Sequence, residues 1–176
     1  FKKPVFDILD AYTLGTLNVE TYHLVLSGGS AGFVNQDLRN GFYDITIASD
    51  ADITTSRPVV FHDLVIEGTW THTGVASSQL GTITDGSISI AAGGVLTGSG
   101  GISIEGDVTN SGECSISYLG INMRFTTSPV TISGASYPVE FDVTTFIIAS
   151  SHNGGTKTVI AGGDLKFTGN WELEYS

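Results

Sequence analysis

Apolar and polar residues alternate in short runs along most of the chain, and between Ser87 and Asp142 the alternation repeats every fourteen residues. Each repeat carries two apolar residues two positions apart and then a small residue. The four copies read SISIAAGGVLTGSG, GISIEGDVTNSGEC, SISYLGINMRFTTS and PVTISGASYPVEFD, and their first apolar column holds Ile88, Ile102, Ile116 and Val130. Residues two apart share one face of a strand, and a fixed period indicates a unit laid against copies of itself. The pattern therefore predicts a repetitive all-β protein.

Two all-β architectures fit this period. In a β-solenoid-like stack, each coil lies on the preceding one and the column from Ile88 to Val130 forms an internal ladder. In the alternative, an antiparallel β-sandwich or jelly roll with an exchanged terminal strand, each block of fourteen residues is one hairpin. Like residues in one column favour the stack, whereas fourteen residues make a short coil, so both remain open.

The first twenty residues differ from the rest of the chain. They lack the glycine-rich turns and carry a series of apolar residues, so they predict an N-terminal arm or first strand. Residues 21–176 then predict a single repetitive β-domain, which the total length of 176 residues accommodates.

Composition narrows the classes of partner. The formal net charge of −11 and the lack of a basic cluster argue against nucleic acid, because phosphate binding needs grouped Lys and Arg. No apolar run reaches the roughly 20 residues that cross a bilayer. Scarce Lys with abundant Ser, Thr and Gly is typical of secreted or cell-surface proteins, so an extracellular location is expected. The single cysteine, Cys114, excludes an internal disulfide and is expected as a small apolar residue.

Candidate chemistry is sparse. The four histidines, His23, His62, His72 and His152, show no metal-ligand spacing and are expected at the surface or in turns. Alternation points Glu67 and Glu105 outward, and no nucleophile motif is present, so the sequence predicts no enzyme. Calcium is the one cofactor considered: Asp50 and Asp52, with Asp44 nearby, lie around a serine-containing turn and offer oxygen ligands.

The stretch SISIAAGGVLTGSGGISIEGDVTNSG, within roughly residues 59–142, resembles the repeat regions of secreted adhesins and autotransporter passenger domains. Those regions are right-handed β-solenoids. The resemblance rests on an Ile-x-Ile pair followed by glycine-rich turns, and it implies a stacked fold and a surface location.

These features predict a structural subunit of an extracellular filament or surface fibre that self-assembles through its terminal strands. An adhesin or carbohydrate-binding module of a surface or phage-fibre protein is the alternative, with a glycan as partner. Trp70 and Trp171 occupy equivalent positions of a looser repeat, so equivalent packing is expected for both. The predicted assembly interface comprises Val5, Phe6, Ile8, Leu9, Tyr12, Leu165, Phe167, Trp171, Leu173 and Tyr175.

Overall fold

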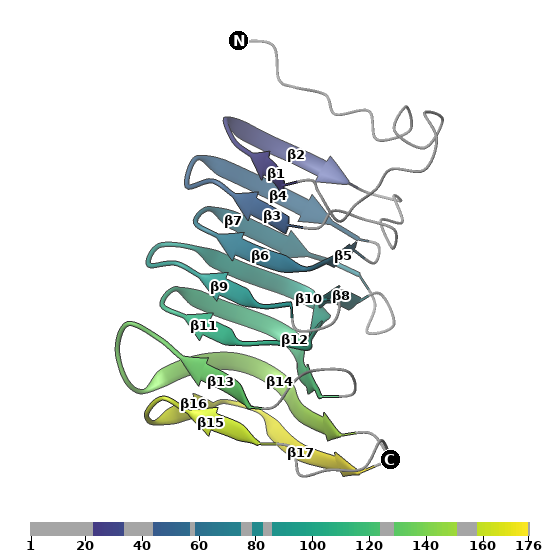
Figure 1. Cartoon of the computed structure of the whole chain (residues 1–176). Helices are drawn as coiled ribbons and strands as arrows, with labels where there is room; N and C mark the ends of the chain where they lie inside the picture. The colour runs from purple at the N-terminus through teal and green to yellow at the C-terminus, as the bar shows by residue number, and fades with distance from the viewer. Residues whose placement is uncertain are drawn as a thin grey trace.

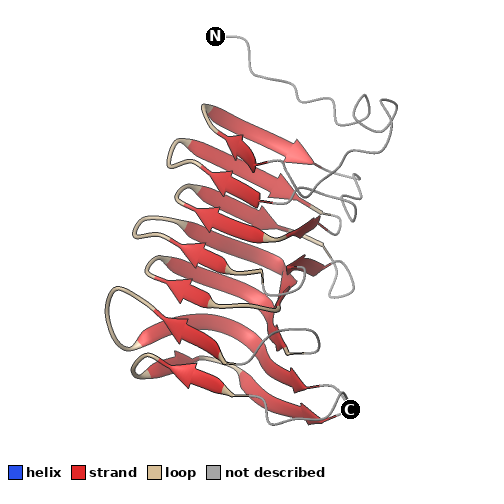
Figure 2. Ribbon diagram, viewed as in Figure 1, coloured by secondary structure: helices blue, strands red, loops and turns tan. Residues whose placement is uncertain are grey.

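The computed structural model describes residues 23–33, 44–56, 59–74, 79–82, 86–123, 129–150 and 158–175. Regular structure in these ranges consists of strands, with no helix (Figure 2). Accordingly, the described residues contain no helix of the length and hydropathy that a membrane crossing requires. The described residues therefore agree with the prediction of an all-β chain.

The strands form two sheets, which Figure 1 shows as a pile of rungs running from β1 and β2 to β15, β16 and β17. The first sheet has the order β1 (His23–Leu26), β3 (Asp44–Ile47), β6 (Asp63–Ile66), β9 (Ile88–Ile90), β11 (Val108–Asn110), β13 (Val130–Ser133) and β15 (Val159–Ala161). The second sheet has the order β16 (Leu165–Phe167), β14 (Val139–Ser150), β12 (Glu113–Asn122), β10 (Val95–Ile104), β7 (Thr69–His72), β4 (Ala51–Thr55) and β2 (Gly29–Phe33). Three further strands join this second sheet: β17 (Asn170–Tyr175) pairs with β14, and β5 (Val59–Phe61) pairs with β8 (Gln79–Thr82), which pairs with β10.

The fold predicted from the fourteen-residue period is wrong in two respects. Every pairing between described strands is parallel, which overturns the antiparallel sandwich or jelly roll. The predicted ladder is also absent, because Ile88 pairs with Leu64 and Val108 and not with Ile102.

The physical reason lies in the path of the chain. It passes through both sheets before it returns to the neighbouring strand, so a fourteen-residue step leads to a different part of the rung. Hydrogen bonds between neighbouring rungs join residues 17 apart at Thr55 and His72 and 27 apart at Ser115 and Asp142. The strand-to-strand step is therefore longer than fourteen residues and varies along the stack.

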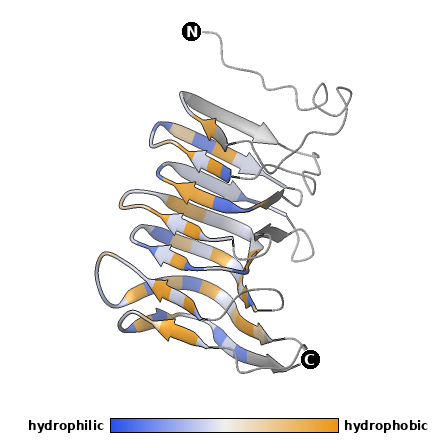
Figure 3. Ribbon diagram, viewed as in Figure 1, coloured by the Kyte–Doolittle hydropathy of each residue, from blue (hydrophilic) through white to orange (hydrophobic). Residues whose placement is uncertain are grey.

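The core fills the space between the two sheets. Along strands such as β3, β6, β9 and β11, buried and more exposed residues alternate, as the hydropathy colouring in Figure 3 illustrates. The first apolar column of the repeat is buried in this single core even though its members do not stack on one another. Its exposed fractions are 2% for Ile88, 0% for Ile102, 4% for Ile116 and 1% for Val130. For this column, alternation thus identified the inward residues correctly and failed on their neighbours.

The long strand β10 of the second sheet contains an irregularity that divides it. In β10, the register shifts between Gly98 and Gly101. Residues before the shift pair with β7, whereas residues after it pair with β8. Glycine is needed here because Gly98 has a φ of 126°, a conformation that other residues rarely adopt.

Candidate functional site

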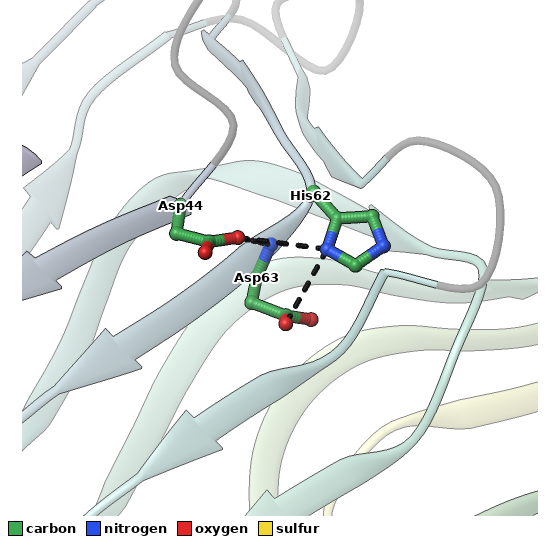
Figure 4. Close-up of side chains that lie close together, drawn as sticks. All are labelled: Asp44, His62 and Asp63. Carbon is green, nitrogen blue, oxygen red and sulfur yellow. Dashed lines mark hydrogen bonds and ion pairs between the residues drawn. The ribbon is translucent and has the colours of Figure 1, made fainter. Parts of the chain in front are cut away.

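One cluster of metal-ligand side chains lies where β3 and β6 begin. Asp44 is the first residue of β3 and Asp63 the first residue of β6, and the two are paired in register. Neighbouring strands lie about 4.8 Å apart, so parallel pairing places the two carboxylates side by side. His62 directly precedes Asp63 and turns its ring toward both of them (Figure 4).

The three side chains converge through one ring nitrogen. Nδ1 of His62 lies 3.5 Å from Oδ1 of Asp44 and 3.3 Å from Oδ2 of Asp63. One ligand atom from each residue lies within 4.8 Å of the others, so the cluster has the geometry to hold a metal ion. The side chains stay partly open to solvent, with exposed fractions of 23% for His62, 34% for Asp44 and 43% for Asp63.

Both carboxylates also bind the backbone of the following rung. Oδ1 of Asp44 accepts a bond of 3.3 Å from the amide of Asp63, and Oδ1 of Asp63 accepts bonds from the amide (2.8 Å) and hydroxyl (2.7 Å) of Ser87. Farther along the stack, Asp107 accepts the amide of Thr131 at 2.7 Å. Aspartate at the start of these strands therefore has a structural role, and Oδ2 of Asp63 is directed at His62.

The predicted metal residues have different outcomes. Asp44 belongs to the cluster, but Asp50 and Asp52 are exposed and join no metal-ligand group among the described residues. His62 was expected at the surface or in a turn and not as a metal ligand, and it completes the group. Sequence spacing could not reveal it, because the strand register alone brings Asp44 beside His62 and Asp63. The placement of His72 at the surface or in a turn is also wrong, since its exposed fraction is 0%.

A second feature is the last rung of the stack, formed by β15, β16 and β17. Trp171 on β17 pairs in register with Phe146 on β14, so both side chains point to the core side. Phe146 is 4% exposed, whereas Trp171 is 67% exposed. The expectation that Trp171 packs like Trp70 is wrong, since Trp70 is only 2% exposed. An inward-facing tryptophan is left open because no described strand follows β17 in the stack.

The predicted interface residues divide into three groups. Leu165 and Phe167 are partly buried against the core, and the Phe167 ring stacks on Phe146 with a centroid distance of 4.1 Å. Leu173 and Tyr175 belong to β17, beside the exposed Trp171. The N-terminal members lie outside the described residues; they are Val5, Phe6, Ile8, Leu9 and Tyr12.

A polar hollow of about 500 Å³ opens on the second sheet, over β12, β14 and the turn before β17. Asp142 stands in its wall and accepts hydrogen bonds from Thr168 at 2.7 Å and Ser115 at 3.1 Å. These bonds, that from Thr168 above all, lower the pKa of Asp142, so its carboxylate stays charged to a lower pH than that of an ordinary aspartate.

Comparisons with protein-family models, with curated proteins and with solved structures found no match for this chain. The functional argument therefore depends on the geometry of the stack and of its sites.

Proposed function

We propose that this protein is a structural subunit that assembles head to tail into an extracellular fibre. The observation that supports this function is the pair Phe146 and Trp171. The same core-facing position is 4% exposed in one rung and 67% exposed in the last. The occupant we assign to this open end is the β1–β2 end of a second copy.

The strand geometry favours a second copy over an unrelated protein. In each sheet the strands are parallel, so the first edge strand of one copy can pair in parallel with the last edge strand of another copy, just as neighbouring strands do within the sheet. Strand β15 of one copy would pair with β1 of the next, and the β16–β17 edge would meet β2, in the direction that every rung already uses. A heterologous contact of this type does not close on itself, and it therefore generates a filament.

The edge strands of the first sheet lack the residues that usually prevent pairing with a strand of another molecule. Proteins protect edge strands with charged residues or proline. Strand β15 has the sequence VIA and strand β1 has the sequence HLVL, neither with an acidic residue, lysine, arginine or proline. On β15, Ile160 is 43% exposed. Assembly would bury apolar surface, and each Å² removed from water would contribute about 25 cal/mol.

The test is the concentration dependence of assembly, measured by sedimentation velocity and negative-stain electron microscopy. The wild type should form fibres, and Trp171→Lys should shift the population to monomers, because a charge then occupies the open end. Ser99→Lys is the matched control, since Ser99 is exposed in the middle of the stack and the change of charge is the same. A wild type that stays monomeric at high concentration, or a Trp171→Lys protein that assembles normally, contradicts the proposal.

Glycan binding remains the second candidate, and the polar hollow beside Asp142 is the observation that favours it. Hydroxyl and carboxylate groups from Ser115, Asp142 and Thr168 give it the polar groups that orient a sugar. A glycan array probed with the wild type and Asp142→Asn separates this function from pure assembly. If the wild type binds particular glycans and Asp142→Asn does not, the protein is an adhesin. If the wild type shows no selective glycan binding, only the structural role is supported.

A further inference from the structure

We propose that Asp44, His62 and Asp63 form a tetrahedral site for a divalent transition cation of the zinc class, with water as the fourth ligand. This inference does not depend on the proposed assembly, because the site lies between β3 and β6, away from the last rung.

The distances within the cluster support a metal geometry. Zinc holds nitrogen and oxygen ligands at about 2.1 Å, so two ligands of a tetrahedral ion lie about 3.4 Å apart. The two separations from Nδ1 of His62 are 3.5 Å and 3.3 Å. Both exceed the distances of about 2.7–2.9 Å that charge-assisted hydrogen bonds prefer. Both separations from Nδ1 therefore match that between two ligands of a tetrahedral ion, and all three ligand atoms lie within 4.8 Å of one another.

The donor set distinguishes between ions. Calcium takes about six to eight oxygen ligands, whereas this cluster offers one imidazole nitrogen and two carboxylates. Imidazole is a preferred ligand of zinc and related transition ions. Calcium, the ion considered from the sequence, therefore fits this particular cluster poorly.

The local negative charge favours binding of a cation at this cluster. Asp44 and Asp63 are register neighbours, and like charges on adjacent strands destabilise a sheet. The net charge of −11 also attracts cations to the whole surface. A bound divalent ion would neutralise the pair and join two rungs of the first sheet.

One residue outside the ligand set positions a ligand. The amide and hydroxyl of Ser87 both donate to Oδ1 of Asp63, which fixes the carboxylate with Oδ2 toward His62. Metal ligands commonly have such a supporting hydrogen bond, and its loss weakens metal affinity by about 10–100-fold. Ser87→Ala keeps the amide bond and removes the hydroxyl bond, so we expect a loss near about 10-fold.

The test uses the full chain without an affinity tag, stripped with a chelator and titrated with Zn²⁺ by calorimetry at neutral pH. We expect one ion per chain and a higher Tm with zinc, since a ligand that binds only the native state stabilises it. His62→Ala should weaken Zn²⁺ binding by more than about 100-fold and abolish the Tm shift. Asp52→Asn is the matched control, because Asp52 is an exposed carboxylate outside the cluster, and it should bind as the wild type does.

Two further measurements make the outcome decisive. Co²⁺ in place of zinc should give the strong visible absorption of a tetrahedral site, and Ca²⁺ should give no comparable heat. The proposal is overturned by any of three results. They are zinc binding that His62→Ala leaves unchanged, no zinc binding by the wild type, and binding of Ca²⁺ as tight as that of Zn²⁺. In the first two cases His62 and the carboxylates form only an ion pair.

Discussion

The hydroxyl oxygen of Thr55 lies 2.9 Å from Nδ1 of His72, deep in the core between β4 and β7. The same oxygen accepts a hydrogen bond of 2.8 Å from the indole nitrogen of Trp70. An indole N–H can only donate, so the Thr55 oxygen is the acceptor for Trp70, and the same hydroxyl forms the hydrogen bond with Nδ1 of His72. One threonine thus serves the two largest polar side chains of this part of the core.

Thr55→Val should destabilise the protein by about 2 kcal/mol or more, because it removes the hydroxyl partner of two buried side chains at nearly constant volume. Thr55→Ser keeps the hydroxyl and loses one methyl group, which should cost about 1 kcal/mol. Urea denaturation followed by tryptophan fluorescence measures both values. Equal stability of the two variants would show that the hydroxyl contributes nothing.

Gly98 and Gly93 provide a second test, because both have a positive φ but different surroundings. A Cβ on Gly98 would clash with the backbone oxygen of His72, whereas a Cβ on Gly93 would meet nothing within 4 Å. Gly93→Ala should therefore cost only the conformational term of about 1–2 kcal/mol. Gly98→Ala should cost more than about 3 kcal/mol, because the backbone of β7 or β10 must also move. Midpoints of thermal unfolding provide the comparison, and similar midpoints for both variants would contradict the close contact.

The sequence predicted the inward residues of this fold better than their neighbours. Alternation is a local property, so Ile88, Ile102 and Ile116 were correctly assigned to a core. Register depends on how many residues the chain uses to return to the same sheet, and turns of different lengths change that number from rung to rung. A constant period of fourteen residues therefore predicted the wrong partner for Ile88, which pairs with Val108.

The candidate metal site shows the same limit. Asp44 was recognised as an acidic residue near a turn, but its partners His62 and Asp63 come from the following rung. Only the register of β3 with β6 places them together. Likewise, alternation assigns Trp171 to an inward position, and only the order of the strands shows that no described rung covers it.

Asn110 links the two sheets and gives a third prediction. Its side-chain amide donates to the carbonyl of Glu140 at 2.7 Å and accepts from the amide of Gly112 at 3.2 Å, and the residue is 4% exposed. Asn110→Ala removes the partners of both backbone groups and should cost about 2 kcal/mol in urea unfolding. Thr109→Ala is the control on the same strand, since its bond to Ser133 is longer (3.3 Å) and only part-buried. A larger cost at Thr109 than at Asn110 would refute this assignment.

The burial of Cys114 leads us to predict that the free energy of unfolding falls at alkaline pH. Its thiol is buried in β12, and this burial, with smaller contributions from the charges of Asp142 and Glu113, raises its pKa from the usual 9.0 to about 12. Above pH 9 the unfolded chain releases the thiol proton while the native state keeps it, so a rise in pH favours unfolding. Between pH 9 and pH 12 this group alone should reduce the unfolding free energy by about 1.4 kcal/mol per pH unit.

Tyrosine and lysine residues titrate in the same range, so the effect of Cys114 is isolated by comparing the wild type with Cys114→Ala. The variant loses some packing at every pH, because a smaller side chain leaves part of the site empty. That deficit should shrink steadily from pH 9 to pH 11, since only the wild type loses the contribution of the thiol proton. Urea unfolding at intervals of half a pH unit measures the difference. A deficit that stays constant over this range would mean that the thiol ionises as readily in the native protein as in the unfolded chain.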